Sequence, residues 1–117
     1  STNTVLTVAF LDVGQGDAVF IETPSGNQML IDGGPNNKVI EELGKVMPLH
    51  DRSLDIVLST HPDKDHIGGL PAVLESYEVE KIFRSGSIAE TGVFQTFNEL
   101  IALEGAEEIL ALQGPRP

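Results

Sequence analysis

Blocks of apolar and polar residues predict strands in the first third of the chain. The β-branched, apolar run at residues 5–12 predicts a largely buried strand, and residues 18–23 predict a second one. Residues 25–27 (Ser-Gly-Asn) are typical of a hairpin turn, and residues 28–32 predict the third strand. The chain is therefore expected to begin with an antiparallel meander.

Apolar residues recur at helical spacing after this meander. A helix is expected over roughly residues 37–47, where an asparagine pair offers an N-cap and Pro48 ends the helix. The later elements are expected as strands at 55–60, 80–84 and 107–112 and as helices at 70–77 and 91–104. Paired strands followed by alternating helices and strands indicate an α/β layered fold.

Length and composition fit a folded domain or part of one. The chain has 117 residues, and we treat residues 1–117 as a single unit with 40% hydrophobic content. No apolar run approaches the ~20 residues of a membrane span, and no signal-peptide pattern opens the sequence. Cysteine is absent, which excludes disulfides and thiolate metal ligands.

Acidic residues dominate the charge of the chain. There are 18 acidic and 7 basic residues, which gives a formal net charge of −11. Such a surface repels phosphate backbones, so the chain alone is a poor candidate for non-specific nucleic-acid binding.

Metal-binding residue types concentrate in one segment, "STHPDKDHIGG" at residues 59–69. His61 and Asp63 are two residues apart, so they can point the same way if the segment is extended. Asp65 and His66 are adjacent and must diverge, which suits two neighbouring metals better than one. The segment follows a predicted buried strand, and the carboxyl ends of strands are where open α/β sheets place their ligands.

The alternative is that this segment is a solvated polar turn, because aspartate and proline favour turns. The buried strand before it favours ligands instead, and so do Gly68 and Gly69 after it, which let the backbone turn tightly into the next helix. His50 lies in a polar stretch after a proline and is expected to be exposed.

The glycine-flanked stretch "DVGQGD" at residues 12–17 is a second candidate feature. It is explained as a turn between strands, and it could also line a pocket with Gln15 or Asp17. It lacks the lysine of a phosphate loop and the strand-to-helix context of a dinucleotide site.

The motif "THPDKDHIGG" resembles the metallo-β-lactamase fold, in which a His-x-His-x-Asp-His segment supplies ligands to a two-metal centre. The upstream "FLDVGQGDAVFIETPSG…MLIDGG" resembles the subgroup with the hydrolase domain of ComEC-type DNA-internalisation (competence) proteins. The resemblance covers roughly residues 5–112. It implies a four-layer αββα sandwich made of two similar halves, of which this sequence would supply the N-terminal half.

By this resemblance His61 and Asp63 would bind the first metal, and Asp65 and His66 the second, with the attacking water near Asp65. Asp63 departs from the pattern, which has histidine there; a carboxylate oxygen lets manganese or magnesium compete with zinc. Asp32 resembles the family's structural aspartate, which orients the ligand loop, although it is also explained as a strand-end turn residue.

The resemblance also shows what the chain lacks. The remaining ligands of the family lie in the second half, and no histidine follows His66 here. A catalytic zinc takes about three protein ligands plus water. We therefore expect weak metal binding and no turnover from this chain alone. A missing C-terminal half, or a second copy forming a homodimer, is expected to cover the exposed face of the sheet.

The predicted function is the N-terminal half of a metal-dependent hydrolase, a phosphodiesterase or nuclease related to DNA uptake. The alternatives are a non-catalytic metal-binding or dimerisation module and a hydrolase of a non-nucleotide ester or lactam, since the fold hosts many substrates. The resemblance favours a bacterial extracytoplasmic or secreted location, with no membrane contact from this segment.

Overall fold

The structure, a computed structural model, describes residues 5–110 as one sheet with helices packed on it. Six strands follow one another in the order β1-β2-β3-β4-β5-β6. The strands are β1 Thr7–Phe10, β2 Val19–Glu22, β3 Gln28–Ile31, β4 Ser53–Ser59, β5 Glu78–Arg84 and β6 Glu107–Leu110. The helices are α1 Lys38–Val46, α2 Lys64–Ile67, α3 Leu70–Ser76 and α4 Gly92–Glu104.

Strand pairing confirms the meander and the α/β layered fold. β1, β2 and β3 pair antiparallel, whereas β3, β4, β5 and β6 pair parallel through helical crossovers. The two central parallel strands begin earlier than the apolar runs predicted, because Ser53 pairs with Glu78 in the ladder although neither is apolar. Residues 111–112 of the last predicted strand lie outside the described residues.

The first strand was predicted to be largely buried, which is wrong: β1 is the edge strand of the sheet, and all of its residues except the half-buried Ala9 are exposed. Two further local details differ from the sequence prediction. Asn37 is the N-cap residue of α1, but its side chain makes no capping hydrogen bond. The Asn36 side chain makes a hydrogen bond to the first residue of the helix instead, since its Oδ1 accepts from Lys38 N at 2.9 Å. The sequence analysis also missed α2, a single helical turn inside the ligand segment, because four residues are too few for a periodic pattern.

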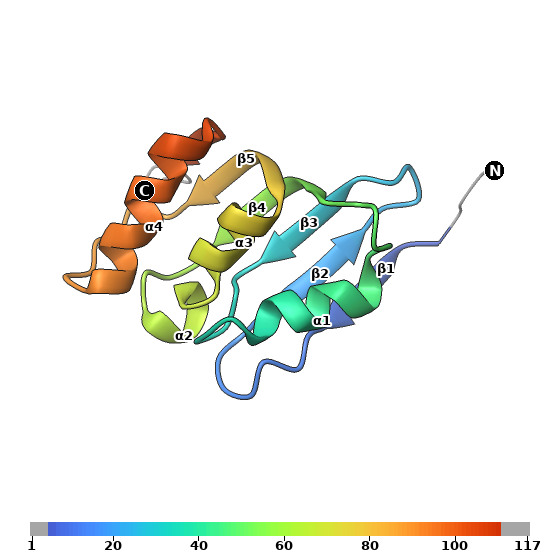
Figure 1. Cartoon of the computed structure of the whole chain (residues 1–117), viewed down its shortest axis with the longest axis horizontal. Coiled ribbons are helices and arrows are strands. Elements are labelled where there is room, and N and C mark those ends of the chain that lie inside the picture. Colours follow the sequence, from blue (N-terminus) through green and yellow to red (C-terminus); the bar gives the residue numbers. More distant parts are fainter. Residues whose placement is uncertain (1–4, 111–117) are drawn as a thin grey trace, which may run out of the picture.

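One face of the sheet is covered by helices and forms the core (Figure 1). Phe20, Leu30, Val57 and Ile82 are register partners on consecutive strands, and all are fully buried. The helices contribute buried residues to the same core: Val39, Leu43, Leu70, Val73, Leu74, Phe97 and Ile101.

The other face of the sheet is open, and we call its two rows of register partners the open face. Successive side chains of a strand point to opposite faces of the sheet, so the residues directly before and after each buried residue point to the open face. The first row is Phe10, Val19, Ile31, Leu58, Phe83 and Ile109, and the second is Val8, Ile21, Met29, Ile56, Lys81 and Glu107.

The open face is apolar apart from Lys81 and Glu107 at one end of the second row. Phe10 is 83% exposed, and the residues of the middle strands are partly exposed. Met29, Ile56, Leu58 and Phe83 line a shallow apolar hollow of about 180 Å³ on this face. Within residues 5–110, no helix has the length and apolar character needed to cross a membrane.

Candidate metal centre

Three loops meet at one edge of the sheet. β1 and β3 run the same way as the parallel strands, so the loops after β1, β3 and β4 all leave at the carboxyl edge. They comprise residues 11–18, 32–37 and 60–69. The carboxyl edge is where α/β sheets place binding sites, and it holds every residue that the sequence analysis selected for metal chemistry.

Asp32 is the centre of the hydrogen bonding at this edge. It is 2% exposed and adopts a φ of 60°, in the left-handed region that few residues other than glycine occupy. Its Oδ1 accepts from Thr60 N at 2.8 Å, and its Oδ2 accepts from Thr60 Oγ1 at 2.5 Å. Its own backbone N donates to Leu58 O at 2.8 Å. These bonds compensate the backbone strain, which costs about 1–3 kcal/mol.

Asp32 also fixes the imidazole of His66. Its Oδ2 lies 2.9 Å from His66 Nδ1. A carboxylate that accepts from backbone and hydroxyl groups is an acceptor here too, so Nδ1 is the donor, and in the neutral imidazole Nε2 is then the nitrogen with the lone pair. This carboxylate–histidine arrangement is the one that commonly orients metal-binding histidines.

The backbone around Asp32 supports the same placement. Gly33 N donates to His66 O at 2.7 Å, which ties the loop after β3 to the loop after β4. Gly68 and Gly69 press against the loop after β3: a Cβ at Gly68 would lie 2.0 Å from Pro35 O, and one at Gly69 would lie 2.3 Å from Gly33 O. These two glycines are thus required by close packing, beyond the tight turn expected from sequence.

The other candidate ligands are exposed beside His66. His61 lies with its ring centroid 5.0 Å from that of His66, at an interplanar angle of 68°. Asp63 begins α2 as its N-cap residue without a side-chain capping bond, and Asp65 lies in the first turn. Among residues 5–110, neither of these two carboxylates has a hydrogen-bond partner, so both are free to accept a metal ion.

The donor types fit a divalent ion, because imidazole nitrogen and carboxylate oxygen are ligands for zinc and manganese. The number of donors is smaller than a complete site needs. Within residues 5–110, no group of three or more histidine, aspartate or glutamate side chains is arranged to hold one metal. The described residues therefore hold no complete metal site, and the four candidate ligands stay a prediction.

The loop at residues 12–17 borders the same site. Asp17 Oδ2 lies 4.0 Å from His66 Nδ1, and the Asp17 side chain is 71% exposed. Gln15 is exposed, and within the described part of the chain its side chain makes no hydrogen bond. His50 is exposed, as expected.

Two residues that build the site were not predicted from the sequence. Thr60, which clamps both oxygens of Asp32, directly follows β4 and precedes His61, a position that could have identified it. Gly16 packs against the backbone of Asp65, a contact between distant loops with no sequence signal.

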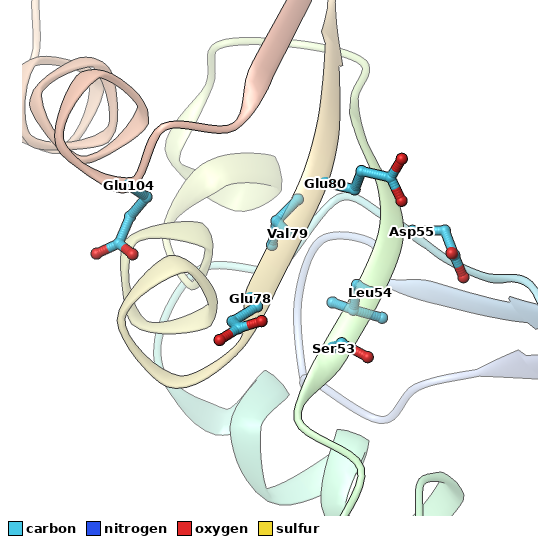
Figure 2. A pocket seen from close by; sticks show the side chains of 7 residues that line it. All are labelled: Ser53, Leu54, Asp55, Glu78, Val79, Glu80 and Glu104. Atoms are coloured by element: carbon cyan, nitrogen blue, oxygen red, sulfur yellow. The ribbon is translucent and has the colours of Figure 1, made fainter.

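A larger hollow lies at the opposite, amino end of the parallel strands (Figure 2). It has a volume of about 520 Å³, and its carboxylates come from Asp55, Glu78, Glu80 and Glu104. In Figure 2, Asp55 and Glu80 point to one side of the strands while Glu104 lies on the other. Asp55 Oδ2 is already occupied by Gln28 N at 2.7 Å, so this hollow is not a converging ligand set.

Comparison with known proteins agrees with this geometry. The family model of the metallo-beta-lactamase superfamily matches residues 11–97, well over half of the chain. The chain belongs to the metallo-beta-lactamase superfamily. Members of this superfamily are generally metal-dependent hydrolases and typically bind zinc. The matched region includes the loop after β1, Asp32 and the whole ligand segment.

A solved structure shows the same fold. The crystal structure of the metallo-beta-lactamase SMB-1 bound to 2-mercaptoethanesulfonate aligns with 70% of this chain at 21% sequence identity and a TM-score of 0.53. The aligned part is 32% of the SMB-1 chain, so this superfamily member spans about a third of that protein's length. No curated protein matches the sequence significantly.

Proposed function

We propose that this chain is the N-terminal half of a metal-dependent hydrolase that cleaves phosphodiesters with a metal-activated water. His61 and Asp63 would hold one divalent ion, and Asp65 and His66 a second. A bound divalent ion lowers the pKa of its water and polarises the substrate oxygen. Asp65, beside that water, is the proposed catalytic residue.

The contact between Asp32 and His66 is the observation that carries this proposal. The buried Asp32 carboxylate accepts from Thr60 and faces His66 Nδ1. This contact fixes the imidazole and leaves Nε2 as the nitrogen available to a metal ion. A solvated polar turn needs neither a buried aspartate nor a left-handed backbone at that position.

The subgroup and the metal are finer proposals. The ComEC-type resemblance in residues 10–34 supports a phosphodiester substrate and a role in DNA uptake at the cell exterior. Asp63 in place of histidine supports manganese as a competitor of zinc, since it adds an oxygen donor. The net charge of −11 argues that basic residues for DNA contact come from the rest of a longer protein.

The open face supports the partner proposal. A contiguous apolar surface of this kind is rare on a monomer in water. In the isolated chain we propose that a second copy covers it, as a two-fold sandwich of the two sheets. The two rows of the open face carry only two charged residues, Lys81 and Glu107, so a contact made through these rows brings few like charges together although each copy has a net charge of −11.

The test uses the longest reading frame that contains this chain, loaded with Mn²⁺ or Zn²⁺ and assayed against bis(p-nitrophenyl) phosphate and nitrocefin. We expect hydrolysis of the phosphodiester, loss of at least about a hundredfold in the Asp65→Asn variant, and little lactam hydrolysis. Equal phosphodiester rates for the wild type and Asp65→Asn would remove Asp65 from the reaction, and preferential lactam hydrolysis would refute the substrate class.

A non-catalytic metal-binding or dimerisation module is the second candidate. It is favoured by the incomplete ligand set within residues 5–110. That candidate predicts metal binding and self-association without hydrolysis in the longer protein as well, which the same assay distinguishes.

A further inference from the structure

The loop at residues 12–17 touches the ligand loop through one glycine. A Cβ built on Gly16 would lie 2.0 Å from Asp65 O, 2.9 Å from Asp65 C and 3.1 Å from Asp65 Cβ. The first two distances are shorter than any real Cβ contact, so the Gly16 backbone lies directly against the peptide of Asp65. Gly16 also has a φ of 76°, in the left-handed region.

Backbone hydrogen bonds hold the 12–17 loop to other elements, so the loop cannot easily move away from its contact with Asp65. Its ends are closed by Leu11 N, which donates to Ala18 O at 2.9 Å. Asp17 O accepts from Gly34 N at 2.9 Å, which fixes the loop to the turn after β3. On the other side Asp12 N donates to Glu42 Oε1, at 3.3 Å, on helix α1.

Glu42 is itself fixed. It is 7% exposed, and its Oε2 accepts from Lys45 Nζ at 2.7 Å. The hydrogen bond from Lys45 lowers the pKa of Glu42, so the carboxylate stays ionised near neutral pH. The 12–17 loop is thus anchored at both ends to elements that belong to the core.

The segment that this loop meets needs external support. Asp65 lies in α2, which has four residues and is too short to be stable by itself. Asp65 has no side-chain hydrogen bond in the described chain that would fix it, in contrast with its neighbour His66. A rigid contact at the Asp65 peptide therefore restricts the direction in which its carboxylate can point.

We propose that Gly16 is a positioning residue: the 12–17 loop acts as a backstop that holds the Asp65 peptide, and through it the Asp65 carboxylate, in the geometry for metal binding. This inference deepens the proposed function and rests on the metal site at Asp65 and His66. It gives the "DVGQGD" stretch a role through its backbone, whereas the alternative from the sequence was a pocket role for Gln15 or Asp17.

Gly14 provides a matched control within the same loop. Its φ is 84°, close to that of Gly16, but a Cβ at Gly14 would meet nothing within 4 Å. Alanine therefore introduces a similar backbone strain at both positions and a collision only at Gly16. Any difference between Gly16→Ala and Gly14→Ala measures the contact with Asp65.

The first measurement is calorimetric titration of each protein with Mn²⁺ and Zn²⁺. We expect Gly16→Ala to bind metal at least about tenfold more weakly than wild type, and Gly14→Ala to stay within about threefold. Equal losses in the two variants would mean that backbone strain, and not the Asp65 contact, is responsible, and would overturn the inference.

The second measurement needs no metal. Gly33 N donates to His66 O, so its amide exchange reports whether the ligand loop is in place. We expect faster exchange at Gly33 in Gly16→Ala than in Gly14→Ala, and equal exchange would overturn the inference. If the wild type binds no metal, the proposed function fails, and this comparison still decides the backstop.

A third measurement covers the case in which Gly16→Ala does not fold. In the wild type, coupling is reciprocal, so metal bound at Asp65 must also stabilise the loop that supports it. We expect Zn²⁺ to slow amide exchange at Gly16 and Asp17. Unchanged exchange there in protein shown to bind Zn²⁺ would refute the backstop.

Discussion

The two faces of the sheet are made from alternate residues of the same strands, yet they are in opposite environments. Ile82 is fully buried under the helices, whereas its neighbour Phe83 lies on the open face beside Leu58. Both faces are apolar, so composition alone does not distinguish them. The difference lies in the helices, which all contribute to the core on one face (Figure 1).

Polar groups show the same contrast. The covered face includes Gln28, Glu42 and Asp32, and each of these buried groups has hydrogen-bond partners. The open face has Lys81 and Glu107 at one end and otherwise no charge. A surface that is apolar but not protected by helices is expected of an interface.

Adjacent residues on β5 give the largest contrast. We expect Ile82→Ala to lower the free energy of unfolding by about 2–5 kcal/mol, because it leaves a cavity in the packed core. Phe83→Ala should cost less than about 1.5 kcal/mol in dilute protein, since no helix packs on that side chain. Urea denaturation of both variants at the same low concentration tests this. A cost for Phe83→Ala as large as for Ile82→Ala would mean that the open face is buried in the monomer.

The dimer proposal is tested by a charge placed on the open face. We expect wild-type protein to sediment as a dimer at micromolar concentration and Leu58→Asp to dissociate it by at least about thirtyfold, since a buried unpaired carboxylate costs about 2 kcal/mol or more. Leu103→Asp is the matched control, because Leu103 is 79% exposed on α4, away from this face. A stable wild-type monomer at micromolar concentration would contradict the proposal.

Asp32→Asn tests the candidate metal site at the carboxyl edge of the sheet. The amide loses the charge that holds His66 Nδ1–H, so we expect metal affinity to fall about 10–100-fold and stability to fall by about 1–3 kcal/mol. Asp55→Asn is the control, because Asp55 also accepts a backbone N–H, from Gln28, but at the other end of β4. Calorimetric titration with Zn²⁺ should show unchanged affinity in the control; a matching loss there would show a general effect on the fold.

Much of this architecture was predictable from the sequence, because period-two and helical patterns reflect burial directly. The pattern places strands and helices within a few residues of their observed ends, and the His61–His66 spacing selects the loop that Asp32 supports. α2 was not predictable, since its four residues fold in a turn set by loops on either side.

Contacts between loops that are far apart in the sequence were harder to predict. The packing of Gly16 on Asp65 and the two hydrogen bonds from Thr60 to Asp32 join segments 28 or more residues apart. The position of Thr60 beside His61 was a signal for the second contact, but no local pattern indicates the first. The superfamily was predictable from the motif. The metal ligands and the ComEC-type subgroup stay predictions; within residues 5–110 no group of three or more candidate ligands is arranged to hold one metal.

The smallest expected effect concerns a polar group at the rim of the covered face. Gln28 Nε2 donates to Asp51 Oδ2 at 2.8 Å, and this hydrogen bond, with those from Ser53, lowers the pKa of Asp51. A carboxyl group whose pKa is lower in the folded state stabilises the protein above its unfolded pKa, near 4, and loses this contribution as pH falls through the folded pKa. We therefore expect Asp51→Asn to lower Tm slightly at pH 7, and this difference from wild type to be smaller at pH 2.5. Thermal unfolding monitored by circular dichroism at both pH values measures the difference. If the Tm difference between the two proteins is equal at the two pH values, the negative charge of Asp51 does not contribute to stability. Only the geometry of the hydrogen bond from Gln28 would then matter.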